Sequence, residues 1–169
     1  MHARIFLIGF MGAGKTTHGK QIARMMEYDF IDMDRWITER QGKSIPQIFE
    51  QNGEPFFRQM ESAAIDELQK REKIVIATGG GAPCHNDNME RMKKAGLTIY
   101  LKLAPGALLV RLQHSKTQRP LLEGKNESEM LRTIQELLEH REPFYSRADM
   151  VIDGLDRVNE RVVNAIQRR

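Results

Sequence analysis

The segment that most constrains the fold lies near the start of the chain. An apolar run from Ile5 to Ile8 leads into Gly9–Thr16 (GFMGAGKT), which fits the pattern G-x-x-x-x-G-K-[ST]. A helix-forming stretch then runs from Lys15 to Met26. Glycines permit a tight turn whose backbone N–H groups point at phosphate oxygens, and the helix start adds positive potential. The sequence therefore predicts a nucleotide-binding loop between a strand and a helix.

Two side chains at the end of this loop have expected chemical roles. Lys15 can reach the β- and γ-phosphates of a nucleotide, and the Thr16 hydroxyl can bind Mg²⁺. The backbone around Gly12, Ala13 and Gly14 is expected to contact the phosphates. ATP and Mg²⁺ are therefore the cofactors that this segment indicates.

The rest of the 169 residues alternates short β-like runs with helical stretches. Five such runs predict an α/β fold in which a parallel sheet is covered by helices on both faces. Ligands of such sheets bind at the carboxyl ends of the strands. The expected strands are 5–8, 30–31, 73–77, 98–103 and 150–152. The expected helices are 15–26, 44–70 with a break at Gly53, 86–94, 105–112, 127–139 and 157–167. The length suits one domain spanning 1–169.

Composition excludes several classes of protein. A hydrophobic fraction of 40% and a charged fraction of 29% indicate a globular chain. The formal charge of +3 without a Lys/Arg block gives no reason to expect nucleic acid as a partner. The single cysteine, Cys84, excludes an internal disulfide framework, and no apolar run is long enough to span a membrane. A cytoplasmic protein is expected.

Two carboxylates follow the second expected strand. Asp32 and Asp34 are spaced so that one could face Mg²⁺ and the other a substrate hydroxyl, whose proton it could accept. The alternative is that Asp34 caps a helix beginning near Trp36 and that Asp32 is merely exposed. The pattern D-x-D alone leaves both open.

Cations and glycines are the remaining candidates. Gly79–Gly81 end the third strand, where three glycines permit close approach of a ligand or form a plain turn. Arg58 lies on an expected helix and could be solvated. Arg141 could bind a ligand or satisfy the end of its helix. The polar segment at about 112–126, which contains Arg119, is a lid that excludes water or an ordinary surface loop.

Together these segments resemble the shikimate kinase family over nearly the whole chain. The likeness rests on GFMGAGKT at 9–16, DMD at 32–34, FRQME at 57–61, TGGG at 78–81, RPLL at 119–122 and REPFY at 141–145. The resemblance implies a three-layer P-loop kinase fold, with a substrate-binding helical region at about 33–61 and a lid. It also implies transfer of the γ-phosphoryl group of ATP to the 3-hydroxyl of shikimate, on the route to chorismate and aromatic amino acids.

The resemblance also implies residue roles. Asp34 matches the residue at the substrate hydroxyls and is the candidate base, whereas Arg58 and Arg141 match the cations that hold the carboxylate. Gly80 matches a backbone contact to substrate. Thr16 and Asp32 match the Mg²⁺ partners. Lys15, Asp34 and Arg119 are the implied catalytic residues. Further nucleotide contacts are expected from Thr17 and Arg119, with Arg111 and Arg157 as candidates near adenine.

Two other functions share part of this pattern. A gluconate-type or nucleoside monophosphate kinase would keep the fold, but it would not need the combination of Asp34, Arg58, Gly80 and Arg141. A non-enzymatic nucleotide-binding module would not need both Asp32 and Asp34. We therefore expect a kinase that acts on shikimate and ATP as a monomer, with no nucleic-acid or membrane partner.

Overall fold

The computed structural model describes residues 4–115 and 120–167 of the chain. Its sheet has five parallel strands in the order β2-β3-β1-β4-β5. The strands are β1 (Arg4–Ile8), β2 (Asp29–Asp32), β3 (Ile74–Ala77), β4 (Leu97–Lys102) and β5 (Met150–Asp153). The predicted parallel sheet is thus confirmed, with strand ends within two residues of those expected.

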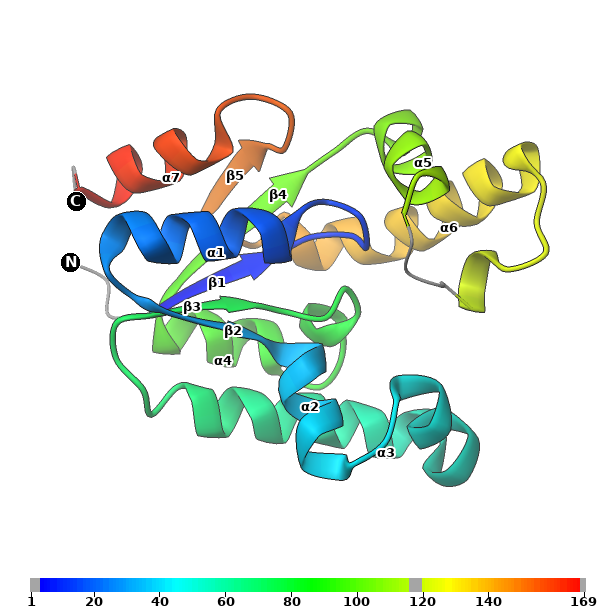
Figure 1. Cartoon of the computed structure of the whole chain (residues 1–169), viewed down its shortest axis with the longest axis horizontal. Helices are drawn as coiled ribbons and strands as arrows, with labels where there is room; N and C mark the ends of the chain where they lie inside the picture. Colours follow the sequence, from blue (N-terminus) through cyan, green and yellow to red (C-terminus); the bar gives the residue numbers. More distant parts are fainter. Residues whose placement is uncertain (1–3, 116–119, 168–169) are drawn as a thin grey trace.

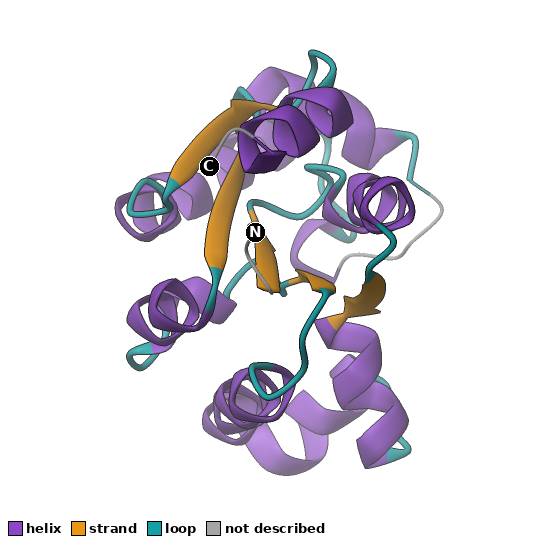
Figure 2. Ribbon diagram, turned by 90° about the vertical axis from the view of Figure 1, so that its left-hand side faces the viewer, coloured by secondary structure: helices purple, strands orange, loops and turns teal. Residues whose placement is uncertain are grey.

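Helices cover both faces of the sheet, as Figures 1 and 2 show. The α1 and α7 helices pack against each other on one face, and α4 contacts the sheet from the other. The helices are α1 (Lys15–Met26), α2 (Met33–Gln41), α3 (Ile45–Leu68), α4 (Asn88–Ala95), α5 (Pro105–Gln113), α6 (Glu127–Tyr145) and α7 (Val158–Gln167), with short 3₁₀ turns η1 (Ala82–Cys84) and η2 (Pro120–Leu122). None of the helices in the described ranges is long and apolar enough to cross a membrane.

The central strand β1 explains why its sequence is uniformly apolar. Ile5, Phe6, Leu7 and Ile8 are all fully buried, because β3 and β4 flank the strand and helices cover both of its faces. β1 therefore places the nucleotide-binding loop Gly9–Thr16, called the phosphate loop below, at the middle of the sheet's carboxyl edge.

Local signals set the boundaries of the helices around this edge. The Ser44 side chain and Gln47 form the expected capping box at the start of α3. Gly53, with φ 80°, breaks α3 as predicted. In contrast, α6 continues to Tyr145 instead of ending near Glu139, although Pro143 removes one backbone donor. The fully buried Tyr145 side chain fixes this last turn against the protein interior.

Candidate active site

The phosphate loop has the backbone that its glycines permit. Gly12 and Gly14 have φ values of 79° and 92°, a region that other residues rarely adopt. Lys15 lies at the start of α1, and its Nζ donates to the carbonyl oxygens of Gly9 at 2.7 Å and Phe10 at 2.9 Å. The ammonium group therefore folds back over the loop, on the side where phosphates would lie.

The end of β2 brings a hydroxyl and a carboxylate together beside this loop. The Thr16 hydroxyl donates to Asp32 Oδ2 at 2.6 Å, and Asp32 Oδ1 accepts the backbone N–H of Arg35 at 3.2 Å. Asp32 thus caps α2, which begins at Met33. The alternative in which Asp34 caps this helix and Asp32 is merely exposed is wrong, because the helix starts three residues before Trp36 and leaves Asp34 in its first turn.

Mg²⁺ in phosphoryl-transfer sites is held by one or two protein oxygens together with phosphate oxygens and water. The Thr16 hydroxyl oxygen and the Asp32 carboxylate fit that requirement. No group of three or more His, Cys, Asp and Glu side chains in the described ranges could hold a metal by itself. The donor set suits an ion that is shared with a nucleotide.

Four ionisable side chains lie close to Gly79–Gly81, the glycine loop that follows β3. A Cβ atom added to Gly79 would lie 2.7 Å from Asp34 Oδ1 and 2.9 Å from Glu61 Oε1. A Cβ atom on Gly80 would lie 3.0 Å from Arg141 Nη1, and one on Gly81 would lie 2.5 Å from Arg58 Nη1. The distances at Gly79 and Gly81 are shorter than real Cβ atoms show, and the one at Gly80 is tighter than most, so the missing Cβ atoms permit this close approach.

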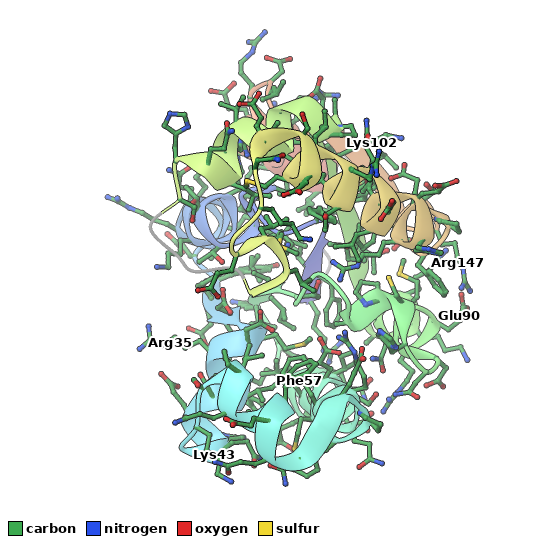
Figure 3. The ribbon with its side chains drawn as sticks, turned by 90° about the vertical axis from the view of Figure 1, so that its right-hand side faces the viewer. Arg35, Lys43, Phe57, Glu90, Lys102 and Arg147 are labelled. Atoms are coloured by element: carbon green, nitrogen blue, oxygen red, sulfur yellow. The ribbon has the colours of Figure 1, made fainter. Side chains whose placement is uncertain are left out.

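Asp34, Arg58 and Arg141 therefore converge on one loop from three different helices, as the family resemblance implied. Figure 3 looks onto this edge of the molecule. Phe57, next to Arg58, lies inside the region built by α2 and α3, while Arg35 and Lys43 lie at its outer surface. The predicted helical region at about 33–61 corresponds to α2 and the first part of α3.

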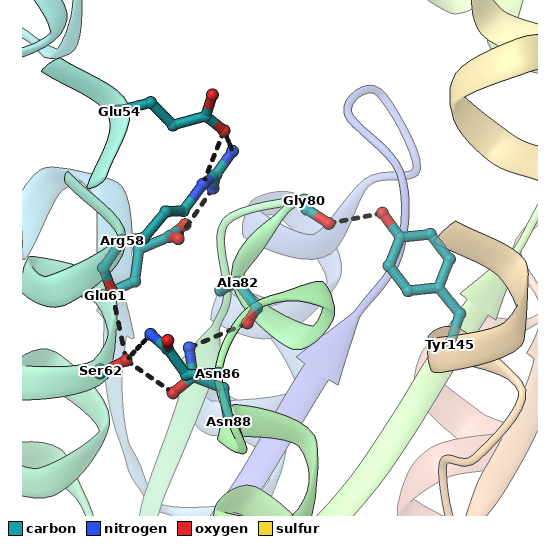
Figure 4. Close-up of polar contacts among 9 residues, drawn as sticks. All are labelled: Glu54, Arg58, Glu61, Ser62, Gly80, Ala82, Asn86, Asn88 and Tyr145. Carbon is teal, nitrogen blue, oxygen red and sulfur yellow. Dashed lines mark hydrogen bonds and ion pairs between the residues drawn. The ribbon is translucent and has the colours of Figure 1, made fainter. Parts of the chain in front are cut away.

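Arg58 is held by two carboxylates of its own helix (Figure 4). Its Nη1 lies 2.8 Å from Glu61 Oε2, and its Nη2 lies 3.0 Å from Glu54 Oε1. Glu61 is only 1% exposed, and this burial raises its pKa to about 7, helped by the charge of Asp34 and opposed by Arg58 and Arg141. Arg58 is therefore a fixed cation and not a solvated surface residue.

Arg141 occupies the opposite side of the glycine loop. Its guanidinium carbon lies 5.4 Å from the centroid of the Phe10 ring, which belongs to the phosphate loop. The alternative in which Arg141 satisfies the end of its helix is wrong, because α6 continues for another turn to Tyr145. Arg141 thus lies between the phosphate loop and the glycine loop.

A separate pocket of about 210 Å³ opens on the other side of the phosphate loop. His18, Arg111, Leu155 and Arg157 are among the residues that line it. Arg111 bridges this region, since it donates to Ala13 O at 3.1 Å and to Gly154 O at 3.1 Å. The two arginines that the resemblance placed near adenine therefore share one pocket at the base of the phosphate loop.

Some site residues differ from the sequence expectations. The structure adds His18, whose Nδ1 lies 2.9 Å from Asn159 Oδ1, and the buried Glu61. A helical spacing of three from Arg58 could have indicated Glu61, whereas nothing in the local sequence marks His18. Thr17 is exposed on the first turn of α1. Arg119 lies outside the described residues.

Known proteins of one family are similar to this chain over nearly its whole length. The family model described as shikimate kinase matches residues 11–169. Over 167 residues, the chain is 44% identical to shikimate kinase of Bacteroides thetaiotaomicron, covering 98% of this chain and 95% of the relative.

Solved structures give the same result at the level of the fold. A crystal structure of shikimate kinase from Bacteroides thetaiotaomicron superposes with a TM-score of 0.92 at 43% identity, covering 99% of this chain and 98% of that chain. Shikimate kinase from Acinetobacter baumannii in complex with shikimate gives a TM-score of 0.88 at 34% identity, with 98% and 93% covered. Since the likeness spans the phosphate loop, the glycine loop and the helices that carry their arginines, the chain belongs to the shikimate kinase family.

Proposed function

We propose that this protein transfers the γ-phosphoryl group of ATP to the 3-hydroxyl of shikimate, giving shikimate 3-phosphate and ADP. The observation that carries the proposal is the convergence of Asp34, Arg58 and Arg141 on the glycine loop. Shikimate is a small carboxylate with three hydroxyls, so its site needs fixed cations for one end and a hydroxyl acceptor for the other. These three side chains supply both.

The acceptor is held at its carboxylate and activated at its hydroxyl. Arg58 and Arg141 bind the carboxylate from opposite sides of the glycine loop, where Gly80 permits close approach. Asp34 accepts the proton of the shikimate 3-hydroxyl while the hydroxyl oxygen bonds to the γ-phosphorus. The bond from the γ-phosphorus to the bridging oxygen breaks, and ADP leaves with that oxygen.

The donor is held by the phosphate loop. Backbone N–H groups around Gly12–Gly14 face the phosphates. The Lys15 ammonium group gives up its hydrogen bonds to the carbonyl oxygens of Gly9 and Phe10 and stabilises the negative charge that develops on the transferred phosphoryl group. Mg²⁺, when bound, would neutralise phosphate charge; Thr16 and Asp32 are the residues that would hold it, Asp32 through water. The adenine ring enters the pocket lined by Arg111, Arg157 and His18.

Three expectations complete the proposal. The whole chain acts as one domain with its helical region at 33–61, and Arg119 in the lid at about 112–126 binds the phosphates. The enzyme acts as a monomer, since every side chain invoked comes from one chain. Its reaction takes place in the cytoplasm, where ATP is available.

A coupled assay of ADP release tests the proposal. The assay compares shikimate, gluconate and a nucleoside monophosphate as acceptors, and Lys15→Ala serves as the control that removes phosphoryl transfer. We expect ADP release with shikimate alone. ADP release with gluconate or the nucleoside monophosphate instead of shikimate would assign a different acceptor to the same fold. ADP release with none of the three would indicate a nucleotide-binding module that is not a kinase.

A further inference from the structure

The glycine loop is fastened to the rest of the protein at a backbone carbonyl. The Tyr145 hydroxyl donates to Gly80 O at 2.6 Å (Figure 4). Tyr145 is fully buried on the last turn of α6, the helix that also carries Arg141 one turn earlier. Sequence and family resemblance assigned Tyr145 no role, and the reaction described above does not use it.

The hydrogen bond fixes more than one atom, because a peptide group is planar. The Gly80–Gly81 peptide bond is trans, so Gly81 N–H points away from Gly80 C=O across the same plane. Tyr145 draws the carbonyl toward α6, and the N–H is thereby directed to the opposite side. Arg58 lies on that side, where a Cβ atom on Gly81 would meet its Nη1 at 2.5 Å.

The loop needs such a restraint. Glycines have the widest backbone freedom of all residues, and a peptide between two glycines can rotate at little steric cost. The next carbonyl along, Gly81 O, accepts the backbone N–H of Cys84 at 3.0 Å. The one after it, Ala82 O, accepts the buried Asn88 side chain at 3.0 Å, and Asn88 is itself bonded to Ser62 at 2.9 Å. That second contact secures the loop beyond the glycines, while Tyr145 secures the Gly80–Gly81 peptide itself.

The position of Tyr145 is in turn rigid. Its ring packs on Tyr100 with centroids 5.1 Å apart, and the Tyr100 hydroxyl donates to Glu142 Oε2 at 2.6 Å. Glu142 is also paired with Lys102 at 2.6 Å. Burial raises the pKa of Tyr145 above its ordinary value, so the hydroxyl keeps its proton and remains a donor at neutral pH.

We propose that Tyr145 is a positioning residue for acceptor binding: through Gly80 O it aims the Gly81 N–H at the acceptor carboxylate, beside Arg58. The inference rests on the proposed function and adds a backbone donor, oriented by α6, to the two arginines. Tyr145 acts through the loop and through Arg141 on the same helix, with which its hydroxyl also interacts; it does not touch the reacting atoms. Its loss should therefore weaken binding of shikimate and leave the chemical step intact.

Two matched variants test this inference. Tyr145→Phe and Tyr100→Phe each remove one hydroxyl from the same buried ring pair, and each hydroxyl makes a 2.6 Å hydrogen bond. Only Tyr145 is bonded to the glycine loop. In Tyr145→Phe we expect the KM for shikimate to rise about 3–10-fold, as for the loss of one hydrogen bond. The kcat and the KM for ATP should stay within about twofold by the same reasoning. Tyr100→Phe keeps the ring that packs on Tyr145 and removes only the hydrogen bond to Glu142, so all three constants should stay within about twofold of their original values.

A second acceptor separates positioning from general damage. With an analogue whose carboxylate is replaced by a hydroxymethyl group, Tyr145→Phe and the unsubstituted protein should bind equally well. Thermal denaturation establishes that both variants are folded at the assay temperature. Equal effects of the two variants on the KM for shikimate, or an equal loss with the analogue, would overturn the inference. Absence of shikimate phosphorylation by the unsubstituted protein would overturn the proposed function instead.

Discussion

Asp34 and Arg141 approach the same glycine loop, but their chemistry differs. Asp34→Asn keeps the shape of the side chain and removes its basicity, so we expect kcat to fall by about 10²–10⁴-fold. Arg141→Ala removes a cation from a carboxylate site, typically costing about 2–5 kcal/mol, so the KM for shikimate should rise at least tens-fold. Steady-state kinetics with each substrate varied in turn measures both effects.

Arg141 is a better choice than Arg58 for comparing the loss of a cation with the loss of the Asp34 carboxylate. Arg58→Ala would leave the buried Glu61 without its ion-pair partner and add a folding defect. The KM for ATP serves as the internal control, because neither substitution lies in the phosphate loop. A variant Asp34→Asn that kept its kcat and changed only the KM for shikimate would make Asp34 a positioning residue and not a base.

Glu61 should make shikimate binding depend on pH. Its pKa is raised to about 7, so the side chain is neutral at pH 6 and negatively charged at pH 8. A negative charge beside Arg58 opposes an anionic ligand. Affinity for shikimate should therefore fall by several-fold from pH 6 to pH 8.

Titration calorimetry at both pH values measures this affinity. Binding of the anion near pH 7 should also be coupled to proton uptake by Glu61, visible as a heat that depends on the ionisation enthalpy of the buffer. Glu61→Gln should abolish the proton uptake and flatten the pH dependence. An unchanged pH profile in that variant would assign the titration to another group.

Residues differ in how far their sequence reveals their role. The positions of Lys15 and Thr16 could be predicted because the whole phosphate loop is contiguous in sequence. Which of Asp32 and Asp34 caps α2 could not, since it depends on the residue at which α2 begins. His18 and Glu61 acquire their surroundings from distant segments, at Asn159 and at the glycine loop.

At the scale of elements, the glycine loop depends on the absence of Cβ atoms from Gly79–Gly81. Gly79→Ala would place a methyl group 2.7 Å from Asp34 Oδ1 and 2.9 Å from Glu61 Oε1. Because Glu61 is buried, Asp34 must yield, and we expect kcat/KM for shikimate to fall at least about tenfold, the equivalent of 1.4 kcal/mol. Kinetics and thermal denaturation of the same preparation separate activity from stability.

Gly106 provides the matched control for that substitution. It lies exposed in the first turn of α5, where an added Cβ atom meets nothing within 4 Å. Gly106→Ala should leave the kinetics unchanged and stabilise the fold by up to about 1 kcal/mol through helix propensity. Equal kinetics for the two variants would contradict the close-approach argument.

Elements also show where local patterns fail as predictors. The starts of α1 and α3 were predictable, because Gly14 marks the first and a capping box marks the second. The length of α6 was not, because Pro143 normally indicates a helix end. Tertiary packing of Tyr145 overrides that preference, and it is visible only once the sheet is assembled.

At the scale of the whole molecule, both substrates should stabilise the fold. A ligand at about 100 times its Kd stabilises a protein by about 2.7 kcal/mol, which for a chain of this size raises Tm by about 5–10 °C. Shikimate and ADP should each produce such a shift in a thermal melt, and gluconate at the same concentration should not. A shift with gluconate in place of shikimate would refute the assigned acceptor.

The overall topology was the most predictable level. Five apolar runs separated by helices leave few arrangements once crossovers must be right-handed and the strands parallel. The order of the strands is a property of the assembled sheet, and no single segment encodes it. That order matters for the site, because it makes β1 and β3 neighbours.

The adjacency of β1 and β3 sets the distance between the phosphate loop and the glycine loop. Neighbouring strands are about 4.8 Å apart, a spacing fixed by backbone hydrogen bonds and independent of side chains. The two loops that extend from these strands meet, since a Cβ atom on Gly80 would lie 3.6 Å from both Gly9 O and Met11 N. The gap that the phosphoryl group must cross is thus inherited from the sheet. An engineer who wishes to change the acceptor can redesign α2, α3 and the glycine loop and leave the donor loop and its alignment untouched.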